Sequence, residues 1–199
     1  MRYEDENVVI IDKESGVNAE AVFSALRRAG GEVHFIHRID RNTEGLLVFA
    51  KNAAAAEELM RCFRERTVEK IYHALVLGSM PKNSAVEEAY LIKDEKTATV
   101  HISKEPKGEK IITEYEVLEK RGDQTLLKVT LHTGKTHQIR AHLAYLGHPI
   151  AGDEKYGDHK KNRAMGLTRQ RLVAKELTLS SSGVLAYLSG KKFVSEKSL

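Results

Sequence analysis

Two short segments of the sequence hold more polar and charged side chains than a folded core requires. Residues 37–45 read His-Arg-Ile-Asp-Arg-Asn-Thr-Glu-Gly and precede an apolar run. Residues 133–142 read Thr-Gly-Lys-Thr-His-Gln-Ile-Arg-Ala-His and lead into a glycine-rich stretch at 147–157. The groups that could do chemistry in these segments are a carboxylate, Asp40, and a guanidinium, Arg140.

Metal chemistry has little support. His137 and His142 are five residues apart, which places them about 140° apart around a helix, so they cannot share one ion as histidines at i and i+4 do. No His-Glu-x-x-His motif occurs, and the single cysteine, Cys62, cannot build a structural zinc site. We therefore expect no metal.

Other catalytic motifs are also missing. The sequence has neither a G-x-x-x-x-G-K-[ST] nor a G-x-G-x-x-G phosphate loop, and no G-x-S-x-G nucleophile elbow. Cys62 falls inside an expected amphipathic helix, so it is a poor candidate for a nucleophile.

Asp40 and Arg140 are 100 residues apart in the sequence, so only the fold could bring them together. Arg140 follows Ile139, about 100° around a helix, and therefore flanks the apolar stripe. His137, three residues earlier, lies on nearly the same face. An arginine beside a buried stripe needs a carboxylate partner. The candidates are Asp40, Asp153 and Glu154, and from the pattern alone a structural ion pair is favoured over an active-site pair.

The elements that must position these groups follow from periodicity and capping residues. Helices are expected from Asn18 to about Arg28, after Asn52, and from Thr136 to Leu146. The apolar face of the second helix would be formed by Ala56, Leu59, Met60 and Phe63. Strands are expected at residues 8–12, 46–50, 71–77, 111–118, 126–131 and 172–179, with two more between 89 and 103. The basic stretch from His159 to Arg171 is expected to be a loop.

About eight strands in runs, with three helices, indicate an α+β fold, a mixed and largely antiparallel sheet with flanking helices. Three prolines, no repeats and no shift in composition predict a single domain over residues 1–199.

Composition narrows the partners only slightly. The net charge is +4 and hydrophobic residues make up 41% of the chain. A basic balance favours a polyanionic partner weakly. No run of 18 apolar residues occurs, so we expect no membrane association, and the N-terminus lacks a signal-peptide pattern. These features predict a cytoplasmic protein.

Three motifs carry a resemblance to a known family. Residues 37–51 read H-R-I-D-x-x-T-x-G-L-L-V-x-A-K, which resembles the active-site motif of the RluA-type RNA pseudouridine synthases. Residues 69–78, E-K-x-Y-x-A-x-V-x-G, are similar to that family's tyrosine motif. Residues 133–150 and 152–157 resemble its arginine motif. The resemblance runs through nearly the whole chain in order.

The resemblance implies an isomerase that detaches uracil from ribose, rotates it and reattaches it through carbon 5, with no cofactor. Asp40 would be the catalytic carboxylate, and Arg140 would hold it ionised. Tyr72 would stack on the uracil ring and help to remove the proton from carbon 5. The sheet would surround a central RNA-binding cleft.

The partner implied is structured RNA, ribosomal RNA before transfer RNA, bound by a monomer. The target uridine would be flipped out of its helix or loop. The expected RNA-binding residues are basic or polar and lie around the motifs: Arg38, Arg41, Lys135, His137, Lys160, Lys161 and Arg163. His37 is expected to support its loop rather than to take part in catalysis.

Some positions depart from the family pattern. An early lysine-proline-x-glycine motif reads Lys-Glu-Ser-Gly at residues 13–16, and Thr-Ser-Gly becomes Thr-Glu-Gly at 43–45. Lys135 and Val173 replace an arginine and a histidine. These changes bear on substrate preference rather than chemistry; Glu44 adds negative charge near Asp40, which Arg41 could compensate. The chain begins directly at the catalytic motifs, so we expect no separate N-terminal RNA-binding module.

Two rival interpretations belong to other functional classes. One is a non-catalytic RNA-binding protein that retains the fold, against which the intact Asp40, Tyr72 and Arg140 argue. The other is an isomerase or hydrolase of small nucleosides, which would turn over free uridine.

Overall fold

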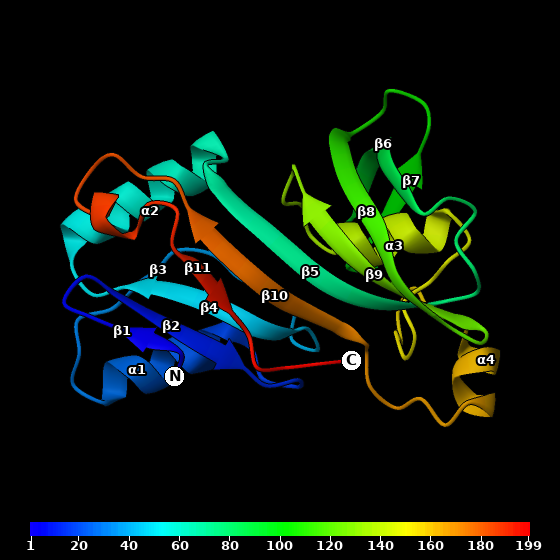
Figure 1. The fold of residues 1–199 in the computed structure, drawn as a ribbon, viewed down its shortest axis with the longest axis horizontal. Coiled ribbons are helices and arrows are strands. Elements are labelled where there is room, and N and C mark those ends of the chain that lie inside the picture. Colours follow the sequence, from blue (N-terminus) through cyan, green and yellow to red (C-terminus); the bar gives the residue numbers. More distant parts are fainter. The chain divides into compact units, whose positions relative to one another are not determined.

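The computed structural model describes all 199 residues. The chain forms two compact units (Figure 1). Unit 1 comprises Met1–Ile71 and Val173–Ser198, and unit 2 comprises Tyr72–Leu172 with Leu199. The expectation that residues 1–199 act as a single domain stays a prediction.

Unit 1 is built on a small mixed sheet. Its strands follow the order β1 (Tyr3–Glu4), β2 (Val8–Lys13), β4 (Glu44–Ala50) and β10 (Leu172–Leu179), while β3 (His34–Phe35) pairs with β4 and β11 (Lys192–Val194) with β10. The β4–β10 pair is parallel, and the pairs β1–β2, β2–β4, β3–β4 and β10–β11 are antiparallel. The helices are α1 (Ala19–Arg28) and α2 (Ala53–Glu65), with a 3₁₀ turn at Ala186–Leu188.

Strand β4 is buried on both faces, which explains its unbroken apolar run. Leu46 and Val48 join the core cluster that includes α2. Phe49 points the other way, because successive side chains alternate along a strand, and its ring stacks on Phe23 of α1 with centroids 6.2 Å apart. The two helices therefore cover opposite faces of β4 (Figure 1).

Helix α2 begins as expected, because the Asn52 side chain accepts a hydrogen bond from the Ala55 amide at 2.9 Å. Its expected apolar face is wrong in one position. Met60 is 49% exposed, and Cys62 is fully buried against the core instead. The stripe that faces the sheet runs through Ala55, Leu59 and Cys62 at helical spacing, and Met60 lies outside it.

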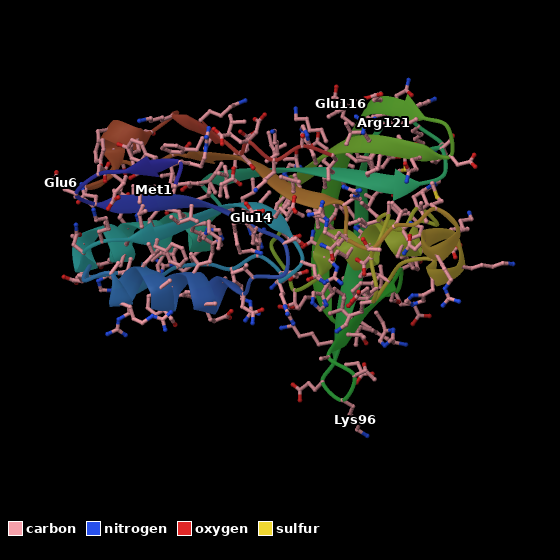
Figure 2. The ribbon with its side chains drawn as sticks, turned by 90° about the horizontal axis from the view of Figure 1, so that it is seen from below. Met1, Glu6, Glu14, Lys96, Glu116 and Arg121 are labelled. Atoms are coloured by element: carbon pink, nitrogen blue, oxygen red, sulfur yellow. The ribbon has the colours of Figure 1, made fainter.

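Unit 2 contains an antiparallel arrangement of longer strands. They follow the order β5 (Val68–Leu77), β9 (Gln124–Leu131), β8 (Glu109–Arg121), β6 (Ser84–Asp94) and β7 (Thr99–Ser103). The β6–β7 hairpin ends in a turn that carries Lys96 at its tip (Figure 2). Two helices belong to this unit, α3 (Gln138–Tyr145), which packs against β7 and β8, and α4 (His159–Ala164).

The fold class is α+β with a mostly antiparallel sheet, as predicted, but with more elements than expected. Eleven strands and four α-helices are present rather than about eight and three. Helix α3 begins at Gln138, two residues late, because His137 adopts a left-handed backbone with φ of 54°. Asn18 precedes α1 without a side-chain capping bond. None of the helices is both long and apolar enough to cross a membrane.

The expected loop from His159 to Arg171 is wrong in its first part, where α4 forms. The helix has no apolar period that a sequence could reveal. It is started by Asp158, whose carboxylate accepts a hydrogen bond from the Lys161 amide at 3.0 Å.

The contact between β4 and β10 requires glycine at position 45. Gly45 has φ of +105°, and a Cβ there would lie 2.3 Å from the carbonyl oxygen of Ala174. We expect Gly45→Ala to lower the free energy of unfolding by more than about 3 kcal/mol, measured by urea titration. Gly31→Ala, where a Cβ meets nothing within 4 Å, is the control and should cost less than about 1 kcal/mol. Equal stability of the two variants would contradict this account.

Candidate active site

Asp40 begins a tight turn that leads into β4. The turn is closed by a hydrogen bond from the Thr43 amide to the Asp40 carbonyl at 3.0 Å. Asp40 itself is half-buried, while Thr43 is 2% exposed. A carboxylate on a turn fixed to a buried strand is accessible yet positioned, which suits a catalytic group.

The Asp40 turn is held by the segment at residues 13–16, the one that departs from the family pattern. The Gly16 amide donates to the Arg41 carbonyl at 3.0 Å, and the Arg41 Nε donates back to the Gly16 carbonyl at 2.9 Å. The Ser15 hydroxyl donates to the Asn42 carbonyl at 3.1 Å. These bonds lie on the two residues that directly follow Asp40, so the segment at residues 13–16 fixes the backbone of the turn.

Lys13 adds the central contact of this arrangement. Its side chain is 1% exposed, and its ammonium donates to the carbonyls of Glu14, Val17 and Arg41 at 2.9, 2.8 and 2.9 Å. All three N–H groups of the ammonium are thus satisfied by backbone.

Burial lowers the pKa of Lys13 to about 8, although the nearby charges of Glu44, Asp40 and Glu14 oppose the shift. Lys13 therefore supplies a positive charge beside Asp40 and Glu44 at neutral pH. Sequence reasoning noted this lysine in a motif but gave it no role; a lysine at the end of an otherwise apolar buried strand is the signal that could have found it.

His37 supports the same loop, as expected. Its Nε2 accepts a hydrogen bond from the Val48 amide in β4 at 3.1 Å, and its ring stacks on Phe63 of α2 with centroids 4.5 Å apart. Burial, with a smaller contribution from Lys70, lowers the pKa of His37 to about 3. A neutral histidine that accepts a backbone hydrogen bond has a structural role here.

Arg140 lies on α3, which is buried around nearly its whole circumference, and is 7% exposed. Within unit 2, Arg140 is held by Asp153: Nε donates to Oδ2 at 2.7 Å and Nη2 to Oδ1 at 3.0 Å. Burial acts against ionisation of Asp153, but Arg140 and the amides of Tyr156 and Lys155 hold its pKa below the usual value. The pair is ionised and bidentate, which fixes the plane of the guanidinium.

Tyr156 supports Arg140 and His137 together. The Arg140 guanidinium carbon lies 5.2 Å from the centre of the Tyr156 ring. The phenol oxygen accepts a hydrogen bond from the Val100 amide at 2.9 Å and lies 2.9 Å from Nδ1 of His137. Sequence reasoning quoted this tyrosine in a motif but did not assign it.

The loop before α3 is fixed by Gln138. Its Oε1 accepts hydrogen bonds from the Thr133 hydroxyl at 2.9 Å and the Lys135 amide at 3.1 Å. Its Nε2 donates to the Ile112 carbonyl at 3.1 Å and to Oγ1 of Thr113 at 3.0 Å. The side chain joins the loop to β8 and leaves Lys135 and His137 at the surface end of the helix.

The other predicted site residues have the following positions. Tyr72 is half-buried against the core of unit 2. Arg38 pairs with Glu20 at 2.9 Å, and Lys135 pairs with Glu109 at 2.5 Å. Lys160, Lys161 and Arg163 belong to α4. Unit 1 holds Asp40, and unit 2 holds Tyr72 and Arg140, so the convergence of these three stays a prediction.

No three histidine, cysteine, aspartate or glutamate side chains gather in a group that could hold a metal ion.

Comparison with known proteins identifies the class. The sequence profile of the RNA pseudouridylate synthase family matches residues 7–145. The solved structure of human RNA Pseudouridylate Synthase Domain Containing 1 is 28% identical, with a TM-score of 0.80 over 99% of this chain and 89% of that one. The chain belongs to the RNA pseudouridylate synthase family, as the motifs predicted.

Relatives with assigned names are similar over most of this chain. A ribosomal large subunit pseudouridine synthase C of Vibrio cholerae is 39% identical over 79% of this chain and 53% of its own length. A ribosomal large subunit pseudouridine synthase D of Nitrosomonas europaea is 36% identical over 89% of this chain and 57% of its own length. The chain spans about half the length of the curated relatives it matches.

The buried ammonium of Lys13 predicts an unusual pH dependence of stability. Its pKa in the folded protein, about 8, lies below the ordinary 10.5, so the unfolded chain binds this proton more tightly. Stability therefore rises with pH between these two values. We expect wild type to gain roughly 3 kcal/mol over Lys13→Met as pH rises from about 8 to about 10.5. Urea titrations at each pH measure this difference.

At pH 7 Lys13→Met should be less stable than wild type by about 1–3 kcal/mol, because carbonyl groups lose their donor. The matched control is Lys120→Met on the exposed end of β8, which should differ from wild type by less than about 1 kcal/mol at pH 7. A wild-type advantage over Lys13→Met that stays flat or shrinks above pH 8 would contradict the lowered pKa.

Proposed function

We propose that this chain is an RNA pseudouridine synthase that isomerises specific uridines in structured RNA, with Asp40 as its catalytic carboxylate. The observation that carries the proposal is the Asp40 turn. It lies within the residues that the family profile matches and in the segment that resembles the family's active-site motif, and backbone and side-chain bonds from residues 13–16 hold the two residues after it. These hydrogen bonds fix the backbone beside Asp40, as a catalytic carboxylate requires and a freely moving surface carboxylate does not.

The reaction class asks for an ionised Asp40 at neutral pH. Lys13 supplies a positive charge near this carboxylate. We assign a second positive charge to Arg140, whose bidentate bond to Asp153 sets its orientation before substrate binds. Tyr72 would stack on the uracil ring and help to remove the proton from carbon 5.

Ribosomal RNA is the favoured substrate, because the named relatives are ribosomal large subunit synthases. Transfer RNA remains a further candidate. Arg38, Arg41, Lys135, His137 and the basic residues of α4 would contact the RNA. The proposal includes action as a monomer in the cytoplasm, without a cofactor.

Asp40→Asn should abolish isomerisation, because the amide keeps the size of the side chain but removes its charge. Unmodified ribosomal and transfer RNA are incubated with each protein, and pseudouridine is detected by carbodiimide labelling and primer extension. Wild type should give new stops, and the variant at least about 1,000-fold fewer. Asp123→Asn, in the exposed turn between β8 and β9, is the control and should match wild type.

Stops that persist with Asp40→Asn would show that another residue is catalytic. Tight RNA binding by wild type without any stops would favour a non-catalytic RNA-binding protein. Turnover of free uridine would favour an enzyme of small nucleosides.

A further inference from the structure

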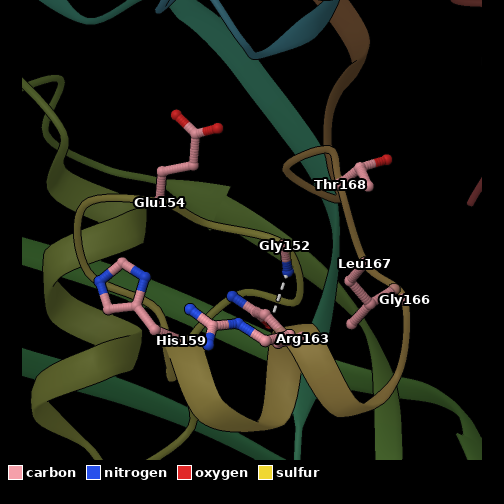
Figure 3. Close-up of a pocket in the computed structure, with 8 residues that line it drawn as sticks. Gly152, Glu154, His159, Arg163, Gly166, Leu167 and Thr168 are labelled. Atoms are coloured by element: carbon pink, nitrogen blue, oxygen red, sulfur yellow. Dashed lines mark hydrogen bonds between the residues drawn. The ribbon is translucent and has the colours of Figure 1, made fainter.

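Helix α4 and the segments around it form a pocket. It has a volume of about 320 Å³. Three segments line it: the turn that follows Ile150, helix α4 and the chain after α4. The lining residues are Gly152, Glu154, His159, Asn162, Arg163, Gly166, Leu167 and Thr168 (Figure 3). A second hollow of about 440 Å³ lies on the same helix, lined by His159, Lys160, Arg163 and Ala164. The shared residues make the two hollows continuous along one face of α4.

Hydrogen bonds and a close backbone contact fix the shape of the pocket. Asn162 is 7% exposed, and its side chain accepts a hydrogen bond from the Gly152 amide at 3.0 Å and donates to the Asp153 carbonyl at 3.3 Å. The Leu167 amide donates to the Asn162 carbonyl at 2.8 Å. A Cβ at Gly152 would lie 1.9 Å from the Arg169 carbonyl oxygen, so the wall of the pocket closes only around glycine. The shape therefore exists before a ligand arrives.

The pocket places an arginine and a histidine on one side of α4. His159 and Arg163 are four residues apart, on one side of the helix, and the Glu154 carboxylate points away from both of them (Figure 3). No carboxylate lies within 4.0 Å of the cationic atoms of Lys160 or Arg163. Arg61 and Arg121, by contrast, are held by glutamates at 2.7–2.8 Å.

We propose that this pocket holds a backbone phosphate of the RNA, bound by Arg163 with His159, and that the adjoining hollow extends the contact to Lys160. The inference rests on the proposed function and deepens it. An arginine with free N–H groups in a polar, preformed recess suits a phosphate. Two hollows joined along one helix favour a polymer of phosphates over one small anion.

The pocket also separates residues that the sequence grouped together. Lys161 is on the same helix but lines neither hollow. A diffuse basic surface would use Lys161 and Arg163 equally, because each carries one charge on α4. A phosphate pocket would depend on Arg163 far more.

The test is the salt dependence of RNA binding. A fluorescent RNA hairpin of mixed sequence, about 40 nucleotides long, is titrated with each protein between about 50 and 200 mM salt. Phosphate contacts do not depend on sequence, so the true target need not be known. Arg163→Gln should weaken binding about tenfold and lower the slope of log K against log salt by about one. Lys161→Gln should have a much smaller effect on both.

Arg64→Gln is the matched control for removal of one charge from the last turn of a helix. Arg64 is 73% exposed on α2 and is 3.9 Å from Glu65, so its loss should leave affinity and slope unchanged. Thermal unfolding of all variants should match wild type, because each side chain is exposed.

Equal losses in Arg163→Gln and Lys161→Gln would overturn the pocket in favour of diffuse attraction, and no loss in Arg163→Gln would overturn it outright. Submillimolar binding of inorganic phosphate by calorimetry, undisturbed by RNA, would reassign the pocket to a free anion and also overturn the proposal. Arg163-dependent RNA binding in a protein that makes no pseudouridine would support this inference while the proposed function fails.

Discussion

The buried ammonium of Lys13 is the constraint on which the Asp40 turn depends. A charged group taken out of water is costly unless every donor finds an acceptor. Here the acceptors are three carbonyls of two separate turns, so the two turns must stay together for the ammonium to be satisfied. The backbone next to Asp40 is therefore fixed by an ammonium group that also places a positive charge near the Asp40 carboxylate.

The polar side chains of α3 are also buried only because each has a hydrogen-bond partner. Half of the buried side chains of this helix are polar. Gln138 binds the loop before it and β8, Arg140 binds Asp153, and Nδ1 of His142 lies 2.9 Å from Oγ1 of Thr113. Burial lowers the pKa of His142 to about 4, so the helix carries one cation rather than two. The buried polar neighbours of Arg140 on α3 therefore each have a hydrogen-bond partner of their own.

The sequence predicted a feature correctly where residues that are neighbours in the chain determine it, and not where tertiary contacts determine it. The cap at Asn52 and the uninterrupted apolar run of β4 are local patterns, and both were predicted correctly. The partner of Arg140 was left among three carboxylates, because the bonds between Arg140 and Asp153 depend on tertiary contacts that the sequence does not display. Lys13 was given no role because its partners are backbone carbonyls, which leave no trace in the sequence. Helix α4 was missed because a single capping aspartate, not an apolar period, starts it.

The side chain of Asn162 connects helix α4 to Arg140 on α3 through one intermediate residue, Asp153. Its side chain holds the Asp153 backbone from α4, while the Asp153 carboxylate holds Arg140 on α3. The position of α4 and the orientation of the Arg140 guanidinium therefore both depend on the Asp153 residue. One amide side chain, that of Asn162, thus ties the wall of the pocket to the residue that orients the arginine.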